Sequence, residues 1–292
     1  MDGAFVGSEY ASHLTDADLR LLASAAGTRE DASRLRGDPG ALVGLLGDPR
    51  VFEAVFGPGD EFGTVGGHPA PVSPFLTFAV AVHRSAAELE SLGHIAERAG
   101  TRQRVPLFDG PDLRDFLGSP GRRLFLAELL ASFTRVASGR YRVAGGGRER
   151  TRRFSELDPV RLAGMLDGVP DADRPGVYRR LGDVSLFLAG VFPDYAALYA
   201  FAPVGAGALL RAAQAPAAEH ERLAEAPGIE LLEYVGARWY RAAFRLAPLH
   251  TARLDVVGEV ADRFRQARRV LNHIADRYLF GAGGAGFAPP AP

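Results

Sequence analysis

Three side chains that could bind a metal ion lie close together in the middle of the first half of the chain. Glu90, His94 and Glu97 are spaced four and three residues apart. On a continuous α-helix these spacings would bring two carboxylates and one imidazole to the same face, where they could hold one metal ion. Gly93 is expected to end the helix, however, and carboxylate-bridged iron sites take ligands from several helices. An ion-paired helix end is therefore favoured, without metal or other cofactor.

Histidine offers acid–base or haem chemistry elsewhere. His273 and Asp276 have the spacing of an oriented acid–base pair on a helix, although a hydrogen bond at the edge of a bundle is the simpler interpretation. His68 lies in the Gly- and Pro-rich stretch GGHPAPVSP, and loops of this kind either meet ligands or simply turn the chain. A rival hypothesis places haem or iron between helices, held by His68, His83 or His94.

One acid interrupts the apolar segment YRRLGDVSLFLAGVFPDY, residues 178–195. The surrounding apolar residues predict a helix at the centre of the fold, and a carboxylate there requires a partner. Arg179, Arg180 or Arg84 could pair with Asp183. A structural salt bridge is favoured, and an acid that faces a ligand is the alternative.

Two glycines in the same segment predict close helix packing. Inside a helix, Gly182 and Gly190 each cost about 1 kcal/mol relative to alanine. This cost is tolerated where another helix comes close, so we expect a neighbouring helix to cross at these positions.

An arginine-rich segment separates the two halves of the chain. Residues 139–153 combine three consecutive glycines with Arg140, Arg142, Arg148, Arg150, Arg152 and Arg153. The segment has little apolar surface to bury, so we expect a flexible connection between an N-terminal helical lobe (1–138) and a C-terminal lobe (154–280) that packs on it. Arginine could contact phosphate or nucleic acid there. Because only one tyrosine is present for stacking on bases, a solvated loop is favoured.

Composition excludes several chemistries. The 292 residues include neither Cys nor Lys, so no thiolate nucleophile, Cys-bound cluster or Schiff-base lysine is possible. The G-x-S-x-G and H-E-x-x-H motifs are absent. A net charge of −1 provides no general attraction to nucleic acid. There is neither a secretory signal nor an apolar run of the roughly 20 residues that span a bilayer, so a cytoplasmic protein without membrane association is expected.

Helix starts are marked by five capping residues, each followed by proline. The pairs are Asp38-Pro39, Asp48-Pro49, Ser73-Pro74, Ser119-Pro120 and Asp158-Pro159. Asp and Ser accept hydrogen bonds from unpaired N–H groups of the first turn, and proline fits the first helical position. No sustained alternation typical of strands appears. The sequence predicts an all-α bundle of about 10–13 helices without significant β-sheet.

The last expected helix, residues 253–280, carries an unbroken apolar seam from Val257 to Tyr278 with spacings of three and four. Packing of this seam within its own bundle is favoured, and self-association through residues 257–278 is the alternative. Residues 281–292 are rich in Gly and Pro, so a disordered tail is expected.

The apolar segment also carries a recognisable motif. The pattern R-x-L-G-D-x-x-L-F-x-x-G-x-F-P, at residues 179–193, resembles that of a widespread family of uncharacterised bacterial all-helical proteins. Val72–Leu76 at the start of an apolar helix, and Gly236 with Tyr240, are similar to the same family. The resemblance covers residues 70–245 and implies a helical fold, but brings no activity with it.

No group of residues converges on a catalytic arrangement. The favoured hypothesis is therefore a non-enzymatic helical protein that binds a protein partner or a small ligand. The expected groove contains His68, Arg84, Arg180, Asp183 and Tyr195. A haem- or metal-binding enzyme of oxidoreductase type is the second hypothesis. Arginine-mediated binding of nucleic acid or phosphate is the third.

Overall fold

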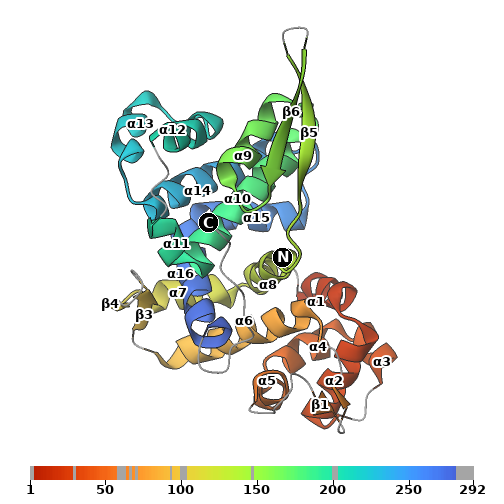
Figure 1. The fold of residues 1–292 in the computed structure, drawn as a ribbon. Coiled ribbons are helices and arrows are strands. Elements are labelled where there is room, and N and C mark those ends of the chain that lie inside the picture. The colour runs from red at the N-terminus through yellow and green to blue at the C-terminus, as the bar shows by residue number, and fades with distance from the viewer. Residues whose placement is uncertain are drawn as a thin grey trace. The chain divides into compact units, whose positions relative to one another are not determined.

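The described part of the chain is predominantly helical, as the sequence predicts (Figure 1). The computed structural model describes residues 3–28, 31–57, 64–65, 68–69, 72–92, 94–98, 104–145, 148–198 and 203–280. Among these residues, no helix combines the length and the apolar character that crossing a bilayer requires.

The described residues divide into two compact units. The first unit comprises residues 3–96, 106–134 and 273–280, and the second comprises residues 97–105 and 135–272. The main boundary, after residue 134, lies close to the boundary expected from the sequence. The end of the chain differs, because residues 273–280 belong to the first unit and not to the lobe 154–280.

The first unit is built around α6, which is buried along most of its length and packs against α8. Its helices are α1 (Gly3–His13), α2 (Asp16–Ala26), α3 (Ala32–Gly37), α4 (Pro39–Leu46), α5 (Pro49–Phe56), α6 (Pro74–Ser91), α7 (Gly110–Gly118) and α8 (Pro120–Ser132). The short strands β1 (Thr64–Val65) and β2 (His68–Pro69) pair antiparallel. A single π-helical turn, η2 (Ala275–Leu279), also belongs to this unit.

The second unit is built around α10 and α14, which pack against each other. Its elements are β5 (Ser138–Gly145), β6 (Arg148–Ser155), α9 (Pro159–Ala163), the 3-10 turn η1 (Gly164–Asp167), α10 (Arg174–Val191), α11 (Pro193–Leu198), α12 (Pro203–Ala212), α13 (Ala217–Ala224), α14 (Gly228–Leu246), α15 (Ala252–Asp262) and most of α16 (Phe264–Ile274). Strands β3 (Ile95–Arg98) and β4 (Arg104–Leu107) form a further two-stranded sheet.

The five predicted cap-Pro pairs all begin helices. In each helix the capping side chain accepts a hydrogen bond from a backbone N–H of the first turn; the caps are Asp38, Asp48, Ser73, Ser119 and Asp158. Gly27 ends α2 with a left-handed φ of 68°, a conformation that glycine adopts without strain.

The predicted close approach at Gly182 and Gly190 is confirmed. A Cβ atom at Gly182 would collide with the ring of Tyr240 on α14, and one at Gly190 would lie 2.7 Å from Leu271 Cβ on α16. A third glycine, Gly236 on α14, leaves room for Phe264 in the same way. These three contacts join α10, α14 and α16 into the core of the second unit.

Residues 139–153, for which a solvated loop is expected, form most of an antiparallel hairpin in the part of the chain that the structure describes. Strands β5 and β6 pair antiparallel, with Ser138 opposite Ser155 and Gly145 opposite Arg148 (Figure 1). Cross-strand pairing satisfies the backbone N–H and C=O groups without a large apolar surface, which is why composition alone did not reveal the hairpin. The side chains of the six arginines in this segment lie outside the described residues.

The last helix is interrupted, which corrects the expectation of one continuous helix over 253–280. α15 ends at Asp262, α16 begins at Phe264, and the π turn η2 follows α16. The seam residues are nevertheless buried in the single chain; they are Val257, Val260, Phe264, Ala267, Leu271, Ile274 and Tyr278. The contacts of Phe264 and Leu271 with the glycines support packing within the chain's own bundle. The predicted tail, residues 281–292, lies outside the described residues.

Candidate functional site

A cleft of about 720 Å³ opens in the second unit, between α9, η1, α10 and α12. This volume lies within the range of about 300–1,000 Å³ that is typical of small-ligand sites. Its apolar lining comes from Val160, Ala163, Leu166, Ala208 and Ala212. Its polar lining comes from Asp167, Arg174, Tyr178, Arg211 and Gln214.

Helix ends position most of the polar groups of the cleft. The Asp158 carboxylate caps α9 through the backbone N–H groups of Val160 and Arg161, each at 3.0 Å. Arg174 opens α10, and the buried Tyr178 lies one turn further along the same helix. Because these residues are fixed by helices, the cleft is largely formed before any ligand arrives.

The two cleft arginines have few partners of their own. Among the described residues Arg211 forms no ion pair, and its guanidinium lies against Gly207, at which a Cβ atom would be 3.3 Å from Nη1. Arg174 Nη1 lies 2.9 Å from Asp171 Oδ1, but the Asp171 side chain is 90% exposed. Arg174 Nε is buried and has no hydrogen-bond partner in this part of the structure. Both guanidinium groups therefore keep donors that a bound anion could use.

Gln214 is held in an unusual backbone conformation at one edge of the cleft. Its φ is 52°, in the left-handed region that residues other than glycine rarely adopt. Arg238 of α14 stabilises this turn by donating from Nε to Ala213 O at 2.8 Å and from Nη2 to Gln214 O at 2.6 Å. Gln214 and Tyr178 also border a second, smaller cavity of about 80 Å³. The turn is the C-cap of α12, in which Gln214 N–H donates to Arg211 O and Ala215 N–H donates to Leu210 O, both at 2.9 Å.

Asp183 is enclosed by two donors. Its Oδ1 accepts hydrogen bonds from Arg179 Nε and from the Tyr240 hydroxyl, both at 2.8 Å, and its side chain is 12% exposed. The guanidinium of Arg179 also lies over the Tyr240 ring, 5.8 Å from its centroid. Burial, together with the charge of Asp183, raises the pKa of Tyr240 well above its usual value, so the phenol stays protonated as a donor. The predicted partner Arg179 is thus the arginine that binds Asp183.

The other residues of the predicted groove are distributed over both units. Arg180 Nη2 lies 3.2 Å from Glu156 Oε2, and Tyr195 is half-buried on α11, both in the second unit. Arg84 belongs to the first unit, where its Nε lies 3.1 Å from Glu88 Oε1. The side chain of His68 lies outside the described residues. Within neither unit do the described residues bring all five predicted groups together.

The alternative metal set does not lie on one helix. α6 ends at Ser91, so Glu90 is on the helix, His94 follows it and Glu97 is in β3. Glu97 pairs with Arg268 and also lies 3.3 Å from Arg269 Nε. The common helix face that this set required is therefore missing.

His83, one of the candidate haem ligands, is a core residue. It is buried, and its Nε2 lies 3.1 Å from the hydroxyl of the buried Tyr10. Burial and the positive charge of Arg123 lower the pKa of His83 to about 3, so the imidazole is neutral at pH 7. A neutral histidine that is hydrogen-bonded to Tyr10 serves the packing of the first unit.

His273 lies against Glu88 of α6, with 3.9 Å between His273 Nε2 and Glu88 Oε2. Burial lowers the pKa of His273, although the negative charges of Glu88 and Asp276 oppose this effect. Arg277, on the π turn, lies 2.8 Å from Glu88 Oε2. These contacts hold His273 and Arg277 against Glu88 of α6, so His273 does not form an acid–base pair with Asp276 alone.

Comparison of the chain with protein-family models, with curated proteins and with solved structures gives no match. The resemblance of residues 70–245 to a bacterial helical family therefore stays a prediction.

Sequence reasoning missed most of the cleft. Arg174, Arg211 and Gln214 stand in ordinary helical or connecting sequence, without a motif that would single them out. Tyr178 opens the apolar segment that drew attention, but as a core residue. The nearest signal in the sequence was the presence of several helix boundaries among the segments that line the cleft. Loops and helix ends on a rigid scaffold are common places for a site.

Proposed function

We propose that this protein binds a small organic acid in the cleft of the second unit, without chemically changing it. The observation that carries the proposal is the pair Arg174 and Arg211 beside an apolar lining. A guanidinium in a concave, partly apolar site offers parallel N–H donors that match the two oxygens of a carboxylate. Apolar side chains on the cleft wall would then cover the hydrocarbon part of the ligand.

Replacing Asp171 by a ligand carboxylate as the partner of Arg174 costs little free energy. An exposed ion pair such as Asp171–Arg174 contributes only about 0–1 kcal/mol to stability, and Arg211 has no such pair to break among the described residues. Hydrogen bonds to charged groups contribute about 1.5–3 kcal/mol each. The balance favours a ligand carboxylate over the existing contacts.

Asp167 restricts the kind of acid that fits. It lines the same cleft and is exposed, so its carboxylate opposes a ligand with several negative charges. A monocarboxylate with an apolar body and a hydroxyl or amino group on the side of Asp167 would meet both arginines and would bring no second negative charge near this acid. We therefore expect the ligand to be a hydroxy acid or an amino acid, and not a nucleotide or a polyphosphate.

The test is a calorimetric and thermal-shift titration of the full chain with phenyllactate and phenylalanine, with phenyllactate methyl ester as the uncharged control. Arg211→Gln is expected to weaken carboxylate binding by at least about tenfold, since about 1.4 kcal/mol corresponds to a factor of ten. Asp167→Asn is expected to strengthen the binding of phenyllactate. Arg34→Gln removes an exposed arginine of α3 in the first unit and is the matched control.

Equal binding of the acid and its methyl ester would contradict the proposal, as would equal affinities in the Arg211→Gln and Arg34→Gln variants. The rival hypothesis of a haem- or iron-binding enzyme predicts visible absorbance of the purified protein. Binding of nucleic acid predicts an affinity that falls steeply with salt.

A further inference from the structure

α1 is anchored firmly in the first unit. A side chain at Gly7 would collide with the backbone of Pro39 on α4, so the two helices touch through backbone atoms at this point. Tyr10, one turn further, is completely buried and packs its ring on Phe75 and His83 of α6. The adjacent face of α1 is therefore presented to α8 in a fixed orientation.

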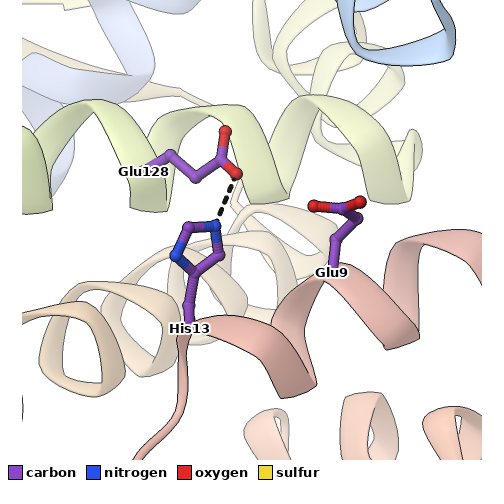
Figure 2. Close-up of side chains that lie close together, drawn as sticks. All are labelled: Glu9, His13 and Glu128. Atoms are coloured by element: carbon purple, nitrogen blue, oxygen red, sulfur yellow. Dashed lines mark hydrogen bonds and ion pairs between the residues drawn. The ribbon is translucent and has the colours of Figure 1, made fainter.

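That face carries two groups able to bind a metal ion, and α8 supplies a third. Glu9 and His13 are one turn apart on α1, and Glu128 faces them from α8 (Figure 2). One potential ligand atom from each residue lies within 4.8 Å of the other two. His13 Nε2 already lies 2.8 Å from Glu128 Oε1. The imidazole is further oriented by Phe75, whose ring centroid lies 4.5 Å from that of His13.

We propose that Glu9, His13 and Glu128 form a binding site for a divalent metal ion of the zinc class. One imidazole nitrogen and two carboxylate oxygens are a donor set that zinc accepts, with bonds of about 2.0–2.2 Å. Bonds of this length bring ligand atoms to within about 3–4 Å of each other, so only small side-chain rotations are needed. Three protein ligands leave one position for water.

The charges and the access to solvent also suit a cation. A divalent ion interacts favourably with both carboxylates at once, whereas a protonated histidine supplies one positive charge at most. The side chains of His13 and Glu128 are 35% and 18% exposed, so an ion can enter without unfolding α1. Binding replaces the His13–Glu128 hydrogen bond and requires the neutral imidazole.

The experiment is a titration of the metal-free full chain with ZnCl₂, followed by competition against a zinc-binding dye, and with CoCl₂, followed by visible absorbance. Uptake of one ion per chain is expected, with a cobalt spectrum of low coordination number. His13→Ala and Glu128→Gln are expected to weaken zinc binding by more than about tenfold, because even the loss of an outer-shell partner costs about 10–100-fold. His220→Ala, on α13 of the second unit, is the matched control.

Glu9→Gln keeps the size and shape of a half-buried side chain and removes only its negative charge. It is expected to keep the melting temperature of the apoprotein while lowering the rise in melting temperature caused by zinc. The proposal would be overturned by the absence of stoichiometric zinc or cobalt uptake, or by His13→Ala and His220→Ala chains that bind zinc equally. The result is independent of ligand binding in the cleft, because the two sites share no residue.

Discussion

The hydroxyl of Tyr240 on α14 donates a hydrogen bond of 2.8 Å to Asp183 Oδ1 on α10, and Arg179 donates to the same oxygen. The carboxylate thereby links the two helices at the centre of the second unit. An acid in an apolar helix is tolerated here because both of its neighbours satisfy it.

Replacing Asp183 by alanine is expected to lower the free energy of unfolding by about 2–4 kcal/mol, since it removes the acceptor that the buried Tyr240 hydroxyl and the Arg179 guanidinium share. Tyr240→Phe removes one of two donors and is expected to cost about 1–3 kcal/mol. Urea denaturation of both single variants and the double variant gives the coupling between the two residues. Strictly additive losses would show that the bond contributes nothing.

The glycines of α10 offer a paired test of helix packing. Gly182→Ala would bring a methyl group into collision with atoms of the Tyr240 ring, whereas a Cβ atom at Gly176 would have no heavy atom within 4 Å. Gly182→Ala is therefore expected to destabilise the protein by about 1–3 kcal/mol through overpacking. Gly176→Ala is expected to stabilise it by up to about 1 kcal/mol, because alanine favours the helix. Thermal melts of the two variants should move in opposite directions.

Helix ends were predictable from the sequence because their signals are local. Asp48 and Ser73 cap helices through N–H groups two or three residues away, and proline follows each of them. No such signal marks α1, because GAFVGSEYASH has neither a cap-Pro pair nor a regular apolar stripe. Its place in the fold depends on Gly7 meeting Pro39, which no local pattern reveals.

Partners distant in the sequence were the least predictable part of the candidate sites. Arg179 could be proposed for Asp183 because the two are one helical turn apart. Tyr240, 57 residues away, could not. Arg174 and Arg211 likewise line one cleft only because α10 and α12 both form part of its wall. The hairpin β5–β6 was missed for a related reason, since strand pairing depends on a partner strand and arginine-rich sequence does not favour strands.

Arg268 joins two acids in the interior of the second unit. Its side chain is 5% exposed, its Nε lies 2.5 Å from Glu233 Oε1, and it also pairs with Glu97. Arg268→Met is expected to cost about 3–5 kcal/mol, because both acids would lose a buried counter-charge. Arg265 contacts the same Glu233 but is 64% exposed, so Arg265→Met should change stability by no more than about 1 kcal/mol. If urea denaturation gave equal losses of stability for Arg268→Met and Arg265→Met, burial would not determine how much these ion pairs contribute.

His83 gives the first unit a defined pH dependence. The pKa of His83 is lowered to about 3 in the folded state, chiefly by burial, against about 6.5 in the unfolded chain. The unfolded state therefore binds the proton more tightly, and the contribution of His83 to stability is complete above pH 6.5. It is lost as the pH falls from 6.5 toward 3, with a slope of at most about 1.4 kcal/mol per pH unit.

His83→Gln removes this titration and keeps a polar group near Tyr10. The unfolding free energy of the variant, measured from pH 5 to pH 7, should therefore depend less on pH than that of the parent protein. His220→Gln, which changes a half-exposed histidine on α13, is the matched control. In the parent protein, the imidazole resonances of His83 should not shift between pH 5 and pH 8. A midpoint near 6.5 would show that His83 is open to solvent, and that Tyr10 and Arg123 do not exclude the imidazolium from the core.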